Sequence, residues 1–272
     1  MIWDSISHLA DGSWVRLIFA NLFWRSHMEH ISIEYKKVLS DIRAFIFDVD
    51  GTLYQQKKLR RLIYKKMLNN LFYHPLKGFE SVISVLSYRR ALEKLRTINF
   101  GDTPLKEMQF KIASNISLIN ENRIKEHVRR WMKCEPLNFL EYVKYPDLDI
   151  FLRKAKRNGF KLAVFSDYPV EKKIEYLGYK DIFDIEISSQ DSFINKLKPD
   201  PTGIEYIVKY LNLKKNEIIY IGDRYDIDTT TAHNAGVKCI IIGEHEELLS
   251  DEVICVKSYK QIFWILNSTL DT

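Results

Sequence analysis

Asp48 and Asp50 are the residues of this sequence whose spacing points most directly to chemistry. They stand two positions apart after the apolar run 44–47, and Gly51 follows them. Residues two apart at a strand end face the same side, and the glycine permits a tight turn there. Paired carboxylates repel each other unless a cation or a shared proton neutralises them, and oxygen ligands suit Mg²⁺. The pattern indicates a cation site; the alternative is a plain Asp-Gly turn.

Ser166 and Asp167 follow the next long apolar run, residues 161–165. A hydroxyl and backbone N–H groups at such a strand end can hold phosphate oxygens. An N-cap for the helix that begins after Pro169 is the alternative. This pair on its own does not decide between the two interpretations.

Lys196 and Lys198 precede the closely spaced prolines Pro199 and Pro201. A lysine held before a proline-stiffened helix start can neutralise a bound phosphate. The alternative is a lysine on a solvent-facing loop.

Asp223, Asp226 and Asp228 follow the apolar run 218–221. A solvated acidic loop would explain them. A second acidic cluster at a strand end, however, can combine with Asp48 into a small oxygen-rich cation site built from distant parts of the chain.

The elements that must position these residues alternate between strands and helices. We expect strands at 44–47, 161–165, 182–187, 218–221, 237–242 and 252–256, and helices at 147–158, 170–177, 202–211, 229–235 and 259–266. This alternation predicts an α/β fold with a doubly wound parallel sheet, in which ligands bind at the carboxyl ends of the strands. Residues 55–145 carry apolar positions at helical spacing and predict helices only.

Taken together, the four motifs resemble the haloacid dehalogenase superfamily of phosphohydrolases. The matching residues are Asp48-Val49-Asp50-Gly51-Thr52 for the first motif, Ser166 for the second, Lys198 for the third, and Gly222-Asp223 with Asp228 for the fourth. The resemblance covers residues 42–54 and about 146–245. It implies a Rossmann-like core at 41–54 and 146–272, with an α-helical cap domain at 55–145 inserted between the first two motifs.

The resemblance also implies a role for each motif residue. Asp48 would attack phosphorus and form an aspartyl-phosphate, and Asp50 would act as general acid and then base. Mg²⁺ would be held by Asp48, Asp223 and the backbone carbonyl of Asp50. The remaining residues would bind the phosphoryl group (Ser166, Asp167 and Lys198) or support the site (Thr52 and Asp228).

The expected function is that of a Mg²⁺-dependent phosphatase acting on a small phosphorylated metabolite, with a sugar phosphate as one candidate. A phosphomutase and a non-catalytic interaction protein on the same core are the alternatives. Substrate choice should lie with the cap. Tyr54, Gln55 and Gln56 directly follow the first motif and are expected to face the active site, whereas Lys57, Arg60 and Arg61 could meet a second anion or face solvent. His74 and His127 have no second metal ligand or catalytic residue near them in a recognisable pattern, and we expect structural roles for both.

Composition narrows the class of protein. The chain has 272 residues, 46% of them hydrophobic and 28% charged, which excludes a disordered chain, and its net charge of +5 is mild. No nucleic-acid-binding signature is present, and no apolar stretch is long enough to span a membrane. The odd cysteine count without a CxxC spacing argues against a disulfide framework and favours a cytoplasmic setting.

Residues 1–40 form an apolar extension with no counterpart in the resemblance, centred on the run 14–24. Three interpretations stay open. The segment packs on the body of the protein, contacts a partner or a second copy of the chain, or, with the least support, lies on a membrane surface.

Overall fold

Short apolar runs form the inner strands of a sheet. The computed structural model describes residues 41–98, 101, 103–243 and 253–262. The strands β1 (Ala44–Phe47), β2 (Lys161–Ser166) and β4 (Ile218–Gly222) are buried along almost their whole length. Runs buried on both faces are typical of a parallel sheet that is covered by helices on both sides.

All strand pairs of the six-stranded sheet are parallel, and its order is β3-β2-β1-β4-β5-β6. The outer strands are β3 (Ile185–Ser188), β5 (Lys238–Ile242) and β6 (Val253–Val256). The strand order reverses direction at β1, so the gap between the carboxyl ends of β1 and β4 is the place where such sheets bind ligands. The predicted α/β fold with a doubly wound parallel sheet is confirmed.

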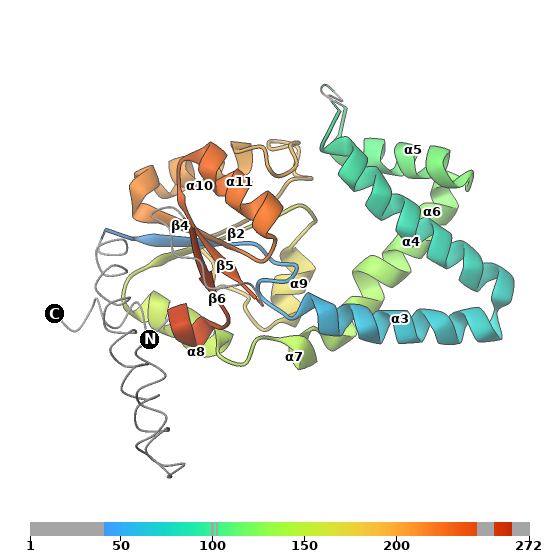
Figure 1. Cartoon of the computed structure of the whole chain (residues 1–272), viewed down its shortest axis with the longest axis horizontal. Coiled ribbons are helices and arrows are strands. Elements are labelled where there is room, and N and C mark those ends of the chain that lie inside the picture. Colours follow the sequence, from blue (N-terminus) through green and yellow to red (C-terminus); the bar gives the residue numbers. More distant parts are fainter. Residues whose placement is uncertain (1–40, 99–100, 102, 244–252, 263–272) are drawn as a thin grey trace, which may run out of the picture. The chain divides into compact units, whose positions relative to one another are not determined.

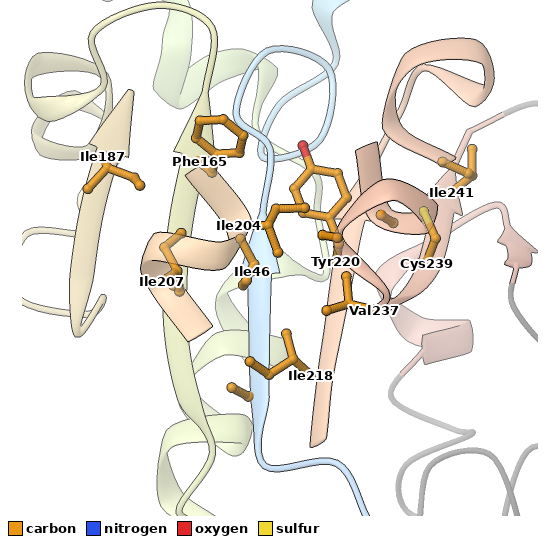
Figure 2. Packing of buried hydrophobic residues seen from close by; sticks show 14 of the residues in the cluster. Ile46, Phe165, Ile187, Ile204, Ile207, Ile218, Tyr220, Val237, Cys239 and Ile241 are labelled. Carbon is orange, nitrogen blue, oxygen red and sulfur yellow. The ribbon is translucent and has the colours of Figure 1, made fainter. Parts of the chain in front are cut away.

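Helices cover both faces of the sheet (Figure 1). One face carries α10 (Thr202–Leu211) and α11 (Tyr225–Ala235), and the other carries α8 (Leu148–Arg157). Alternate residues of β1 point to opposite faces, because side chains alternate along a strand. Figure 2 shows the apolar core between the sheet and the helices α10 and α11, where Ile46 lies beside Ile204 and Tyr220.

The second face of the sheet is packed with aromatic rings. The ring centroids of Phe45 and Phe151 lie 5.5 Å apart, and those of Phe151 and Tyr259 lie 5.3 Å apart. Strand β1, which ends at Asp48, is therefore packed on both faces: against this aromatic layer on one side and against the apolar cluster around Ile46 on the other.

Every described element between Gln56 and Val143 is a helix or a helical turn, and this helical segment leaves and rejoins the sheet at one place. The segment comprises α3 (Gln56–Tyr73), α4 (Pro75–Leu95), α5 (Leu105–Ser117), α6 (Glu121–Val128), the π-helical turn η1 (Arg129–Cys134), the 3-10 turn η2 (Glu135–Phe139) and α7 (Leu140–Val143). An isolated antiparallel bridge between Tyr54 and Lys144 closes its base. It has its own apolar cluster, including Tyr88, Phe110 and Ile124. The division into a core and a cap domain stays a prediction.

Two element boundaries differ from the prediction and affect the interpretation of the site. Helix α11 begins at Tyr225, four residues before the predicted start, because Asp226 and Asp228 lie in its first turn, where acidic side chains favour the helix dipole. Strand β3 begins at Ile185 rather than at residue 182, because the carboxylate of Asp184 accepts a hydrogen bond from Leu162 N and ends the preceding turn. The short helix α9 (Glu171–Tyr176) and the turn η3 (Lys215–Glu217) complete the described elements.

Some predictions concern parts of the chain that the structure does not describe. The apolar extension at residues 1–40 and the end of the helix predicted at 259–266 lie outside the described residues. The compact unit that the structure describes is Ile42–Gln261. Within the described ranges, no helix is both long and apolar enough to cross a bilayer, and all three cysteines are free thiols.

Candidate active site

Three carboxylates meet at the ends of β1 and β4. Asp48, Asp223 and Asp228 each offer a carboxylate oxygen, and these oxygens all lie within 4.8 Å of one another. The backbone N–H of Asp48 donates to Ile221 O at 2.8 Å, which joins the two strand ends. Asp48 and Asp228 are 5% and 1% exposed, respectively. The structure therefore brings Asp48 and Asp223, predicted to share one cation, within reach of a single ion.

Burial and mutual repulsion raise the pKa values of two of these groups. Burial is the main cause that lifts the pKa of Asp48 to about 6 and that of Asp223 to about 8. The charge of Asp228 adds to both shifts, and the charge of Asp48 adds to the shift of Asp223. Lys198 offsets this only in part. Three clustered carboxylates beside one ammonium are a donor set of hard oxygens with excess negative charge, which fits a divalent cation such as Mg²⁺.

Lys198 lies at the centre of this cluster. Its Nζ donates to Asp48 Oδ1 at 2.7 Å and to Asp228 Oδ1 at 2.9 Å. Burial opposes its charge, but the carboxylates of Asp228 and Asp48 hold its pKa well above the usual value. The third acceptor, Tyr220 Oη at 2.9 Å, comes from β4 and was not among the predicted site residues. A buried tyrosine on an apolar strand gives no sequence signal of such a role.

Asp228 also shapes the loop that carries Asp223. Its Oδ2 accepts the backbone N–H groups of Asp223, at 3.1 Å, and Arg224, at 2.9 Å. A Cβ at Gly222 would lie 2.3 Å from Asp228 Oδ2, so only glycine lets the helix bring this carboxylate so close. Asp226, in contrast, pairs with Arg224 and is 69% exposed at its side chain. Asp228, the acid matched to the fourth motif, therefore lies at the site, whereas Asp226 lies at the surface.

Asp50 lies apart from the three-carboxylate cluster in its contacts. Its two carboxylate oxygens accept hydrogen bonds from Lys173 Nζ at 2.5 and 2.6 Å, and Oδ1 also accepts one from the Tyr54 hydroxyl. Burial would raise the pKa of Asp50, but the charge and hydrogen bonds of Lys173 hold it below the usual value. A metal contact of Asp50 through its backbone carbonyl stays a prediction.

Lys173 is a site residue that sequence reasoning missed. It lies on α9, the helix that follows β2, so it is carried to the same sheet edge as Asp50. The available signal was a pair of lysines, Lys172 and Lys173, in the first turns after a strand's carboxyl end. Sequence alone does not say which of the two faces the site.

Ser166 and Asp167 lie at and just after the end of β2, and both line the cleft described below. Ser166 is 1% exposed at the end of β2, where its hydroxyl is close to the site. The carboxylate of Asp167 binds Arg96 at 2.5 Å, and its other oxygen accepts Lys198 N at 3.2 Å. Because this carboxylate is already engaged and would repel a phosphate, any phosphate contact of Asp167 falls to its backbone. Phosphate binding by either residue stays a prediction.

Arg96 ties the helical segment to the site. Besides Asp167, its guanidinium donates to the backbone oxygen of Lys198. It follows the end of α4, and nothing in its sequence surroundings distinguishes it from the other arginines of that helix. The contact is long-range, so only the tertiary structure reveals it.

The turn after Asp50 is held by Thr52 and lies against the fourth motif at Gly51. Thr52 is fully buried, with its hydroxyl 3.5 Å from Asp48 Oδ2, and its backbone oxygen accepts the Tyr259 hydroxyl at 2.9 Å. Gly51 has φ +117°, and a Cβ there would lie 2.0 Å from Asp223 Oδ2. The turn therefore needs glycine both for its backbone and for the space that Asp223 occupies.

Gly51→Ala tests this close approach. We expect it to displace the Asp223 carboxylate and weaken Mg²⁺ binding by about tenfold or more, with a loss of about 1–3 kcal/mol in the free energy of unfolding from backbone strain. Calorimetric Mg²⁺ titration and thermal unfolding measure the two effects. Gly159→Ala is the matched control, because φ is +81° there but a Cβ meets nothing within 4 Å. Equal Mg²⁺ affinities for both variants would contradict the steric argument.

A cleft of about 1190 Å³ opens beside these residues within the compact unit. Asp48, Asp50, Ser166 and Lys198 line it together with side chains of the helical segment. Of the expected substrate-facing residues, Tyr54, Gln56 and Arg60 line the cleft, whereas Gln55, Lys57 and Arg61 do not. Neither His74 nor His127 lines it; His127 Nδ1 lies 3.0 Å from the Ser81 hydroxyl, a structural contact.

Comparisons with known proteins agree with this geometry. The family model described as haloacid dehalogenase-like hydrolase matches residues 45–242. A phosphoglycolate phosphatase of Psychrobacter arcticus is 35% identical over 98 residues, which are 35% of this chain and 41% of that protein. A glyceraldehyde 3-phosphate phosphatase of Methanocaldococcus jannaschii is 26% identical over 220 residues, 78% of this chain and 90% of that protein.

A solved structure supports the fold. The magnesium-bound HAD-hydrolase YfnB of Bacillus subtilis superposes with a TM-score of 0.59 at 14% identity, covering 83% of this chain and 99% of that one. At this identity the likeness concerns the arrangement of helices and strands alone.

Proposed function

Since this chain belongs to the haloacid dehalogenase-like hydrolases, we propose that it is a Mg²⁺-dependent phosphatase that acts through a phosphoaspartate on Asp48. Its relatives are phosphatases of small phosphate compounds, and the chain is accordingly a phosphoric monoester hydrolase. The observation that carries the finer proposal is the meeting of Asp48, Asp223 and Asp228 at the cleft, beside Lys198.

Asp48 is the nucleophile of the proposed reaction. One of its carboxylate oxygens attacks phosphorus, a new O–P bond forms, and the bond from phosphorus to the leaving oxygen breaks. Lys198 and the Ser166 hydroxyl orient the phosphoryl group and balance its negative charge. Asp48 and Asp223, with Asp228 beside them, would hold Mg²⁺, which supplies positive charge against the charge developing on the phosphoryl oxygens.

Asp50 moves the proton in both half-reactions. Protonated Asp50 gives its proton to the leaving oxygen, and the resulting carboxylate then takes a proton from the water that attacks the phosphoaspartate. The Lys173 contact favours the ionised form, which suits the second step. A substrate phosphate competes for the Lys173 ammonium, and loss of that partner raises the pKa of Asp50 toward the acid role.

Phosphate release from a panel of phosphorylated metabolites tests the proposed function directly. Free phosphate is measured with Mg²⁺ and with a chelator, and the products are analysed for isomeric phosphosugars. We expect Mg²⁺-dependent phosphate release from at least one small phosphomonoester. A folded protein that releases no phosphate from any of them, or that only isomerises a phosphosugar, would overturn the proposal.

Mg²⁺ should stabilise the protein in a pH-dependent way. The unfolded chain releases the protons of Asp48 and Asp223 near the ordinary pKa of 3.8, whereas the folded protein keeps them up to about 6 and about 8. The free energy of unfolding of the metal-free protein therefore falls as pH rises across this window. Because Mg²⁺ binds the deprotonated carboxylates, its stabilising effect should grow between about pH 5 and about pH 8.

Thermal unfolding with a chelator and with excess Mg²⁺ measures this effect without any substrate. Asp223→Asn should flatten the pH dependence and shrink the Mg²⁺-induced rise in Tm. The exposed Asp226→Asn is the control and should behave as the parent does. An equal increase in Tm with Mg²⁺ at about pH 5 and at about pH 8 would contradict the predicted coupling between Mg²⁺ binding and deprotonation.

A further inference from the structure

Lys106 and Lys133 line the cleft, yet the proposed reaction gives neither a role. Lys106 lies in the first turn of α5, and Lys133 lies on the π-helical turn η1. Every residue from Trp131 to Cys134 lines the cleft. π-helical turns are rare in proteins and often occur at functional sites.

The cleft wall formed by the helical segment is strongly basic. Eight basic side chains and two acidic ones from this segment line the cleft. One of the two acids, Glu93, already pairs with Arg96 at 3.1 Å and with Arg224 at 3.3 Å. The opposite charges are therefore separated: the carboxylates gather at the strand ends, and the excess positive charge lies on the helical side.

Lys106 and Lys133 differ from the lysines of the reaction centre in their partners. Lys198 and Lys173 each form an ion pair with an aspartate. Among the described residues, no carboxylate forms an ion pair with Lys106 or Lys133. Two ammonium groups without a counter-ion in one cleft attract an anion.

Lys133 is the more constrained of the two. It is partly buried, and burial followed by the charges of Lys106 and Lys173 lowers its pKa below the usual value. Burying an ammonium beside like charges costs free energy unless an anion pairs with it. A bound anion would pair with the ammonium and offset the repulsion from the neighbouring lysines.

We propose that Lys133 and Lys106 bind a second anionic group of the substrate, so that the enzyme prefers phosphorylated metabolites that carry such a group. This inference rests on the proposed phosphatase function and adds the substrate class to it. The transferred phosphoryl group lies at Asp48 and Lys198, and the second anion lies at the helical wall of the same cleft. A monoester whose other end is uncharged leaves the two lysines unpaired.

Two matched substrate pairs test this preference. 3-Phosphoglycerate and glyceraldehyde 3-phosphate share a three-carbon skeleton and differ by a carboxylate in place of an aldehyde. Phosphoglycolate and 2-hydroxyethyl phosphate share a two-carbon skeleton and differ by a carboxylate in place of a primary alcohol. In both pairs we expect the carboxylate compound to have the higher kcat/KM, by about tenfold or more, as is usual for hydrogen bonds to charged groups.

Substitutions assign the preference to the lysines. The double variant Lys106→Gln with Lys133→Gln should lose about 10- to 100-fold in kcat/KM for the carboxylate compounds, mainly through KM, and change little for the uncharged ones. Lys133→Arg should keep most of the preference. Lys111→Gln is the matched control, because Lys111 lies on α5, is exposed and does not line the cleft.

The outcomes separate this inference from the function on which it rests. Equal kcat/KM within the pairs, or a carboxylate preference that survives in the double variant, would overturn the second-anion site while leaving the phosphatase intact. A parent protein that hydrolyses no phosphomonoester would instead overturn the proposed function. Circular dichroism of each variant shows that a loss of activity is not a loss of fold.

Discussion

Asp48→Asn is expected to abolish Mg²⁺-dependent release of phosphate, with a fall in kcat of about 10⁴-fold or more. The amide has nearly the same shape as the carboxylate but is a poor nucleophile. It also removes one of the two carboxylates that pair with Lys198. Substrate binding should survive, because Ser166 and Lys198 are unchanged.

Phosphate release from an aryl phosphate and from a metabolite measures this loss. Acid quenching of the parent during turnover should trap a phosphorylated peptide that contains residue 48, and the variant should give none. Asp226→Asn is the matched control, since it makes the same change at an exposed aspartate that does not line the cleft. Retained activity in Asp48→Asn would remove the phosphoaspartate from the mechanism.

Asp50→Asn is expected to lower kcat/KM for alkyl phosphates by about 10²- to 10⁴-fold, and much less for p-nitrophenyl phosphate. An alkoxide leaves slowly without a proton, whereas p-nitrophenolate is stable and needs none. Because kcat/KM reports only the steps up to departure of the leaving group, it isolates the acid role of Asp50 from its later role as base.

The informative quantity is the ratio between the loss of kcat/KM with alkyl phosphates and the loss with p-nitrophenyl phosphate. Asp50→Asn also breaks the contact with Lys173, so a general disturbance of the site would slow both substrates alike. Lys173→Met provides the comparison, since it removes the same ion pair and leaves the carboxyl group in place. An equal loss with both classes of leaving group in Asp50→Asn would exclude proton donation by this residue.

The sequence by itself was sufficient to predict the alternation of strands and helices in the sheet and the acidic residues that follow its inner strands. The runs at 44–47 and 218–221 are too short and too apolar for anything but buried parallel strands, and a parallel sheet brings the ends of its strands to one edge. Asp48 and Asp223 follow such ends, so their meeting is a consequence of local patterns joined by a general rule of topology.

Contacts between long side chains that are far apart in the sequence could not be predicted from local patterns. Lys173 pairs with Asp50 across 123 positions, and Arg96 reaches Asp167 across 71. Each is one of many basic residues on an exposed helix pattern, and nothing local marks the one that points inward. The predicted start of α11 was wrong for a related reason. Acidic residues are common both in loops and in the first turn of a helix, so their presence does not show where the helix begins.

Short-range preferences and strand alternation thus determined which residues stand at the reactive edge of this protein. Which cations pair with those residues, and which lysines remain to receive a second anion, was decided only by the tertiary structure. The physical reason is that backbone periodicity is set by neighbours along the chain, whereas the partner of a charged side chain is set by whatever the completed fold places within a few ångströms of it.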